Sequence, residues 1–166
     1  MQKELRIQLE EAETLADVFE VVKAAVLKST GKSRGGLMLG LADLGNHPQG
    51  FLGGFFTIGS NVIVMNKTPL QRIRETKPKL YKPYAFFVLL HEYLHSLGYL
   101  DEELVVSRTL EISKKSLGED HPATRIAADI RGFMKSLVYP EVAWKPDREG
   151  IEIVEGFDRS SVTYIG

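Results

Sequence analysis

A nearly continuous apolar run, residues 84–97, most constrains the fold that this protein can adopt. It reads Tyr-Ala-Phe-Phe-Val-Leu-Leu-His-Glu-Tyr-Leu-His-Ser-Leu and is followed by Gly98. An unbroken run of this length is typical of a helix, and apolar side chains around its whole circumference indicate burial on every side. Gly98 suits the end of such a helix, since glycine readily adopts the left-handed conformation found there. We therefore predict a central buried helix around which the other elements pack.

Two histidines and a glutamate interrupt this apolar helix. In His91-Glu92-Tyr93-Leu94-His95 the two imidazoles are four residues apart, so they project from one helix face about one turn apart. Zinc accepts neutral imidazole nitrogen, and a catalytic zinc site combines three protein ligands with one open position. A carboxylate beside that position can act as general base. The pattern predicts a zinc site with His91 and His95 as ligands and Glu92 as the catalytic residue.

The competing interpretation is that both histidines are core residues satisfied by hydrogen bonds, with Glu92 facing solvent. Burying these groups among Phe, Val and Leu costs free energy unless partners exist, and a metal ion would supply them.

The sequence has no cysteine, which excludes a disulfide framework, a thiolate zinc site and a cysteine nucleophile. Any further metal ligand must therefore be His, Asp or Glu.

From His91 to Asp101 the sequence reads H-E-x-x-H-x-x-G-x-x-D without a gap. These eleven residues resemble the extended signature of the metzincin-like zincin metallopeptidases. The resemblance implies that Gly98 turns the backbone sharply and that Asp101 returns as third ligand. It also implies a peptide or protein substrate, bound along an edge strand formed by residues 53–57 or 61–66. The methionine turn of metzincins has no counterpart, because Met134 falls within a helical pattern.

The residues themselves leave the third metal ligand open. His121 ranks first: it precedes Pro122 at the expected start of a helix, a position that Ser, Thr, Asp or Asn would cap better, which suggests another duty. Asp101 ranks close behind, although an Asp there is also a good helix cap. Glu111 ranks third, by resemblance to gluzincins, a zincin branch that takes a glutamate from a later helix, and Glu103 could serve likewise.

Other polar residues near the predicted site are harder to assign. An oxyanion stabiliser is expected close to the metal, typically a Tyr, His or Arg. The candidates are Tyr93, Tyr99, Arg125 and Tyr164, and none is favoured. His47 stands in a loop with Pro and Gly and is expected to face solvent.

The rest of the sequence predicts an α+β fold, zincin-like, with a small mixed or antiparallel sheet packed on the central helix. Residues 3–29 have helical apolar spacing, interrupted near Thr14, which would cap the second part with Asp17 as its partner. Residues 66–79 are polar and predict a connection with about one helical turn. The remaining expected elements are strands within 37–44, 51–58, 61–65 and 151–154, and helices over 102–117 and from His121 to about residue 137.

Length and composition bound the organisation and the partners. With 166 residues, 43% of them hydrophobic, we expect a single domain over 1–166, with residues 139–166 an irregular tail that could cover the cleft. The formal charge of -1 argues against nucleic acid or an anionic membrane as partner. The sequence shows no signal-peptide core and no twenty-residue apolar span, so a cytoplasmic location is expected.

Together these patterns predict a zinc-dependent hydrolase that cleaves peptide or related amide bonds. One alternative is a regulatory or interaction module that keeps a zincin-like scaffold without catalysis. Another is a helical di-iron carboxylate protein, since Glu92-x-x-His95 is the pair used there. That site needs a second Glu-x-x-His, which the sequence lacks.

Overall fold

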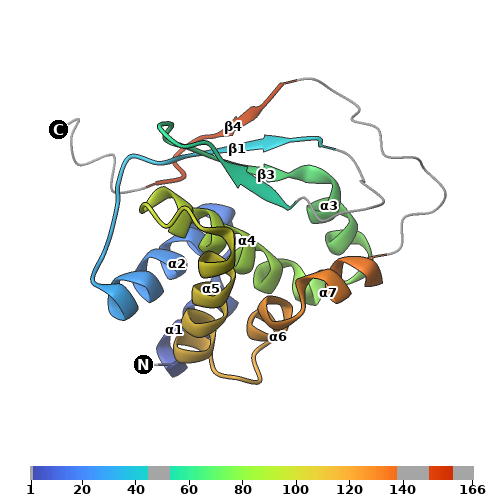
Figure 1. Cartoon of the computed structure of the whole chain (residues 1–166). Helices are drawn as coiled ribbons and strands as arrows, with labels where there is room; N and C mark the ends of the chain where they lie inside the picture. The colour runs from blue at the N-terminus through green and yellow to red at the C-terminus, as the bar shows by residue number, and fades with distance from the viewer. Residues whose placement is uncertain (1, 45–52, 138–149, 159–166) are drawn as a thin grey trace.

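The computed structural model describes residues 2–44, 53–137 and 150–158. These residues form an α+β fold, as predicted: a mixed sheet makes one layer and helices cover one of its faces (Figure 1). The helices are α1 (Gln2–Glu11), α2 (Leu15–Thr30), α3 (Lys67–Thr76), the 3-10 turn η1 (Pro78–Leu80), α4 (Tyr81–Ser96), α5 (Glu102–Leu117), α6 (Pro122–Ala128) and α7 (Ile130–Ser136). The strands are β1 (Met38–Ala42), β2 (Gly54–Phe56), β3 (Val62–Asn66) and β4 (Glu152–Val154).

The break between α1 and α2 lies where the sequence predicts it. Thr14 is the N-cap of α2, and its hydroxyl accepts a hydrogen bond from the Asp17 amide at 3.1 Å. The Asp17 carboxylate accepts in return from the Thr14 amide at 3.1 Å, which completes a capping box. Gly31, with φ 74°, ends α2 in the left-handed conformation.

The sheet has the order β2-β3-β1-β4 among the described strands. β2 and β3 form an antiparallel pair and β1 and β4 another, but β1 and β3 run parallel. The sheet is therefore mixed, which is one of the two predicted arrangements, and not all-antiparallel, which is the other. Periodicity shows that a segment is extended, but the direction of its neighbour depends on the route of the backbone between them. Ile63, Val64 and Met65 are all buried, as expected for an interior strand.

Helix α3 replaces the short connection predicted for residues 66–79. Asn66 caps it by accepting a hydrogen bond from the Thr68 amide at 3.1 Å. Pro69 lies in the first turn, where a missing N–H breaks no intrahelical hydrogen bond. Leu70 and Ile73 are buried, so packing of one apolar side stabilises a helix that its polar composition concealed.

Helix α4 is the predicted central helix. Every side chain from Pro83 to Leu94 is buried, and the helix packs against α2, α5 and α6 as well as β2 and β3. Figure 1 shows it running beneath the sheet, in the middle of the helical layer. The two histidines and Glu92 are thus held on the most enclosed element of the fold.

The helix predicted from His121 to about residue 137 is divided in two. Asp129, with φ -149° and ψ 69°, ends α6 and caps α7, its carboxylate accepting from the Gly132 amide at 3.0 Å. The spacing of the apolar residues is compatible with one helix. The Asp129 carboxylate, however, accepts from a backbone N–H that would otherwise bond within that helix, and so favours a break. By contrast, the helix predicted over 102–117 is confirmed with these bounds, as α5.

The C-terminal strand lies at the opposite edge of the sheet from β2. Beyond β4, the Phe157 ring stacks on Phe19 with centroids 4.3 Å apart. The buried Asp158 carboxylate accepts from Lys23 Nζ at 2.8 Å and from the Leu37 amide at 3.1 Å. The described part of the tail is therefore anchored on α2 and the start of β1. The rest of the predicted tail, 139–149 and 159–166, lies outside the described residues.

Within the described ranges, no helix combines the length and the apolar character that crossing a membrane requires.

Candidate metal centre

Three side chains from two helices meet beside β2. His91 and His95 project from the last two turns of α4, and Glu102 is the first residue of α5. Nε2 of His91 lies 2.6 Å from Oε1 of Glu102, and Nε2 of His95 lies 3.1 Å from Oε2 of the same carboxylate. One donor atom from each of the three residues lies within 4.8 Å of the others, close enough to bind a single metal ion.

The turn between α4 and α5 brings Glu102 to the histidines. Gly98 has φ 105°, a conformation that other residues rarely adopt, and it reverses the backbone directly after the helix. The Tyr99 amide donates to the Leu94 carbonyl at 3.2 Å, which closes the turn. Asp101 then caps α5, its carboxylate accepting from the Glu103 amide at 3.2 Å. The cap sets the direction in which α5, and so Glu102, begins.

Hydrogen bonding assigns the protonation of His95. Nδ1 lies 2.8 Å from the carbonyl oxygen of Tyr99, and because a carbonyl can only accept, Nδ1 carries the proton. In the neutral ring Nε2 then bears a lone pair, which faces the Glu102 carboxylate. Two acceptors at this distance need a proton or a cation between them: a second proton on the ring, a proton on the carboxyl, or a bound metal ion. This arrangement of the other ring nitrogen is typical of histidines that bind metal.

The charges of the three side chains are strongly linked. Burial lowers the pKa of His91, against the effect of Glu102. Burial opposes ionisation of Glu102, but its interactions with His91 and His95 outweigh this and lower the pKa of its carboxyl. Nδ1 of His91 is buried without a hydrogen-bond partner in the described structure. The site thus combines a carboxylate with two imidazoles, and for His91 burial favours the neutral form; this is a donor set that zinc accepts.

Glu92 is buried in the same pocket. Burial, and then the negative charge of Glu102, raise the pKa of Glu92 to about 8. A buried carboxyl is unusual without a partner, and a perturbed acid in a cleft beside possible metal ligands is a candidate for proton transfer.

A pocket of about 270 Å³ opens over these groups. Its lining comes from β2 and the turn that follows, from α4, and from the connection to α5. The lining residues are Gly54, Phe55, Phe56, Ile58, His91, Glu92, His95, Leu100 and Glu102. The site is therefore accessible from outside, and β2 forms one of its walls.

The three third ligands predicted from the sequence lie elsewhere. Asp101 caps α5, as its alternative interpretation proposed. His121 caps α6, with Nδ1 accepting from the Ala123 amide at 3.1 Å, and it does not line the pocket. Glu111 is exposed on α5 and pairs with Arg108 at 3.6 Å and Lys115 at 3.8 Å. None of them belongs to the group of possible metal ligands found in the described residues.

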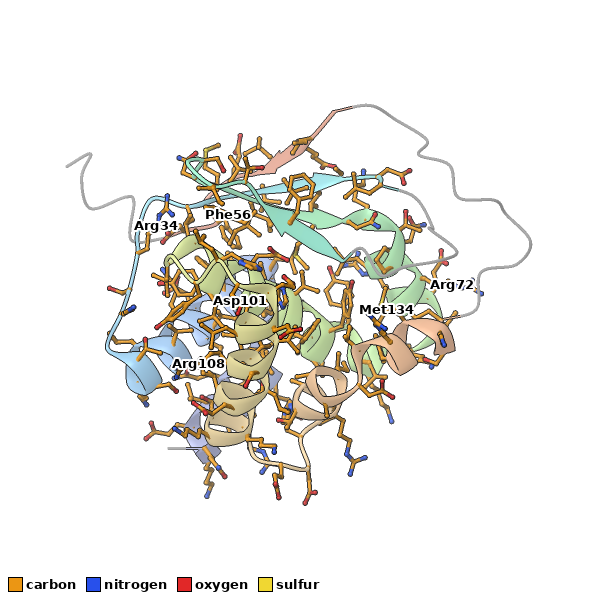
Figure 2. All side chains as sticks on the ribbon, viewed as in Figure 1. Arg34, Phe56, Arg72, Asp101, Arg108 and Met134 are labelled. Carbon is orange, nitrogen blue, oxygen red and sulfur yellow. The ribbon has the colours of Figure 1, made fainter. Side chains whose placement is uncertain are left out.

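Of the suggested oxyanion stabilisers, those within the described residues do not line the pocket. The Tyr93 hydroxyl accepts from the Arg34 amide at 2.9 Å, and Tyr99 contributes its backbone carbonyl to His95. Arg125 is exposed on α6. His47 and Tyr164 lie outside the described residues. Met134 is partly buried on α7 and packs against the core, well away from Asp101 in Figure 2.

Glu102 is the site residue that sequence reasoning missed. The sequence contained a signal for it. Asp is a common N-cap, so Asp101 marks Glu102 as the first residue of the next helix, directly after the turn that follows the histidines. The sequence patterns pointed to the residues on either side, Asp101 and Glu103, but not to Glu102 itself. Only the direction of α5 decides which of three adjacent carboxylates faces the histidines.

Comparison with known proteins finds no match for this protein among family models, curated proteins or solved structures. The function proposed for the site therefore depends on its own atoms: the donors that converge, their burial and the residues around them.

Proposed function

We propose that this protein is a zinc-dependent hydrolase, most simply a peptidase, of zincin-like architecture. His91, His95 and Glu102 hold the metal, and Glu92 acts as general base. The observation that carries the proposal is the convergence of two imidazoles and one carboxylate from α4 and α5, with a second carboxyl, that of the buried Glu92, in the same pocket. Three protein ligands leave an open coordination position, which distinguishes a catalytic zinc site from a structural one.

The donor chemistry supports zinc. Imidazole nitrogen and carboxylate oxygen are both common zinc ligands, and two histidines with one glutamate form a known catalytic set. The hydrogen bond from His95 Nδ1 to the Tyr99 carbonyl leaves Nε2 as the coordinating atom, and it orients the ring. A zinc ion held there would supply Lewis-acid activation of water and of a carbonyl.

Glu92 is suited to moving the proton. Glu92 lines the same pocket as both histidines, and we infer that its carboxyl can reach the open position of a metal ion held there. The positive charge of a metal ion held by the three ligands would lower the raised pKa of Glu92. The carboxylate can then accept a proton from the attacking water and deliver it to the leaving amine. The other groups in the described lining that could accept a proton are the proposed ligands themselves.

The sheet supports a polypeptide as substrate. Of the two strands considered, β3 is interior and β2 is at the edge of the described sheet, next to the metal ligands. An edge strand has unpaired backbone N–H and C=O groups, which an extended peptide can match.

Two measurements on the full-length protein test the function. Protein purified without added metal, then supplied with zinc, should hold about one zinc per molecule by elemental mass spectrometry, and His91→Ala should hold much less. Glu92→Gln should keep the zinc and lose hydrolysis of a casein substrate by at least about 100-fold, the order expected for general-base catalysis. Casein hydrolysis that persists in Glu92→Gln would refute the mechanism. Zinc binding without any hydrolysis would instead favour the non-catalytic module.

A further inference from the structure

Exposed apolar side chains gather around the candidate metal centre. Phe55 is 37% exposed, Ile58 71% and Leu100 58%, and all three line the pocket that contains His91 and Glu92. They come from two separate segments: Phe55 and Ile58 from β2 and the turn after it, and Leu100 from the connection between α4 and α5. Single exposed apolar residues are ordinary on a protein surface, but a group of them around one pocket indicates a surface that a ligand covers.

Apart from the two proposed histidine ligands, the ionisable groups that line the pocket are acidic. The described lining contains the carboxylates of Glu92 and Glu102 and no lysine or arginine. A substrate carboxylate, whether at the end of a peptide or on an acidic residue, would find no lysine or arginine among these residues to pair with. Binding to the proposed zinc ion instead would block the open position that the reaction needs. The lining therefore disfavours removal of C-terminal residues and cleavage beside Asp or Glu.

The size of the pocket indicates how a substrate would be bound. About 270 Å³ is at or below the lower end of the range for sites that enclose a whole small molecule, roughly 300–1,000 Å³. A pocket of this size fits one large side chain with its peptide unit. The remainder of the substrate then lies across Phe55, Ile58 and Leu100, which form the exposed apolar rim of the pocket. This favours a segment of polypeptide over a sequestered metabolite.

We infer that the substrate is an internal polypeptide segment with bulky apolar side chains flanking the cleaved bond, and that Phe55, Ile58 and Leu100 are the residues that select it. The inference rests on the proposed function and makes it more specific. Covering the rim removes apolar surface of both partners from water, which is the main source of the selectivity. One methylene group more or less in such a contact alters specificity by roughly 10- to 200-fold.

The test uses zinc-loaded full-length protein and synthetic peptides with acetylated N-termini and amidated C-termini. The two residues around the central bond are Leu-Leu, Phe-Leu, Ser-Ser or Glu-Glu in an otherwise constant sequence. We expect kcat/KM for the Leu and Phe peptides to exceed that for the Ser peptide by roughly 10-fold or more, with the Glu peptide lowest. A free C-terminus placed next to the bond should reduce cleavage.

Variants assign the preference to the rim. Ile58→Gln and Leu100→Gln should each reduce the Leu-to-Ser ratio while zinc content is unchanged. Leu27→Gln is the matched control, because Leu27 is 51% exposed on α2 and does not line the pocket; its ratio should equal that of the unmodified protein. Equal cleavage of the Leu and Ser peptides, or unchanged ratios in both rim variants, would overturn the inference while the hydrolase proposal stands.

A binding measurement separates the two proposals if none of these peptides is cleaved. Fluorescein-labelled versions are titrated with zinc-loaded Glu92→Gln, and anisotropy reports the dissociation constant. Tighter binding of the Leu peptide than the Ser peptide, lost in Ile58→Gln, would support the inference even if catalysis failed. Equal or undetectable binding of all peptides would overturn it.

Discussion

Nε2 of His91 lies 2.6 Å from Oε1 of Glu102, across the turn that joins α4 to α5. The carboxylate also reaches Nε2 of His95 at 3.1 Å, so a single residue contacts both imidazoles. Because α5 starts with Glu102, the acid is positioned by the first turn of a helix and not by a loose loop. This relationship distinguishes Glu102 from the other carboxylates near the end of α4, and it has direct consequences for metal binding.

Replacing Glu102 by Ala should weaken zinc binding. Loss of a proposed ligand should cost more than the roughly 10- to 100-fold that loss of an outer-sphere partner costs. Glu103→Ala is the control, since Glu103 is also exposed in the first turn of α5 but does not contact the histidines. Competition with a chromogenic chelator measures both affinities. Equal zinc affinity in the two variants would exclude Glu102 as a ligand.

Substitution of Asp101 should separate a cap from a ligand. Asp101→Asn keeps an oxygen that can accept from the Glu103 amide, so both stability and zinc affinity should be retained. Asp101→Ala loses the cap and should lower the free energy of unfolding by about 0.5–2 kcal/mol, measured by urea denaturation. A loss of zinc in Asp101→Asn would show instead that the carboxylate binds the metal.

Arg34 should hold the β2 wall of the pocket against α4. Its guanidinium donates to the carbonyls of Ser96 at 2.7 Å and Ser60 at 3.0 Å, and lies over the Phe56 ring, 5.6 Å from the centroid. Figure 2 shows Arg34 and Phe56 close together at one end of the sheet. The arginine thus joins the end of α4 to the turn after β2.

Arg34→Met should raise KM for the Leu peptide while zinc content stays near one per molecule, because the wall and not the ligand set is disturbed. Arg34→Lys should raise KM nearly as much, since one ammonium group cannot reproduce the planar guanidinium that donates to two carbonyls. Steady-state kinetics measures the change, alongside zinc content. A variant with unchanged KM would show that β2 keeps its place without this contact.

Gly54→Ala should displace β2 and destabilise the fold. A Cβ at this position would lie 2.5 Å from the backbone oxygen of Val64 and 3.1 Å from Cγ1 of Val88. The first contact is with the partner strand β3 and the second with α4, so neither atom can move freely. Overpacking of this kind typically costs about 1–3 kcal/mol. A thermal melt within one degree of the unmodified protein would contradict the close packing.

His121 should make stability depend on pH. Burial, and then the positive charge of Arg6, lower the pKa of His121, against the effect of Glu10. The neutral ring accepts from the Ala123 amide, and protonation removes that acceptor. Because the pKa is lower in the folded than in the unfolded state, this stabilisation is fully present above pH about 6.5. It is lost as the pH falls below that value and through the folded pKa.

Urea denaturation at pH 7.5 and pH 5 measures the effect of His121. His121→Asn keeps a side-chain acceptor at the cap but does not titrate, and the remaining titratable groups are common to both proteins. The stability of the unmodified protein should therefore fall relative to His121→Asn as the pH is lowered. A difference that stays constant between the two pH values would show that the cap does not titrate.

The sequence by itself determined the features that depend on local chemistry. The apolar run 84–97 indicated the central helix, because only burial on all sides suits such a composition. Thr14 and Asp17 marked the break between α1 and α2, and the spacing of His91 and His95 placed two imidazoles on one helix face. Each of these follows from interactions within a few residues.

Tertiary structure alone decided what depends on the direction of one element relative to another. The polar sequence of α3 concealed a helix that is stabilised by packing, and the parallel pairing of β1 with β3 depends on the path of the backbone. The same holds at the candidate metal centre. Asp101, Glu102 and Glu103 are adjacent carboxylates, but a helix points successive side chains about 100° apart. Only the packing of α5 on α4 therefore selects Glu102 to face His91 and His95.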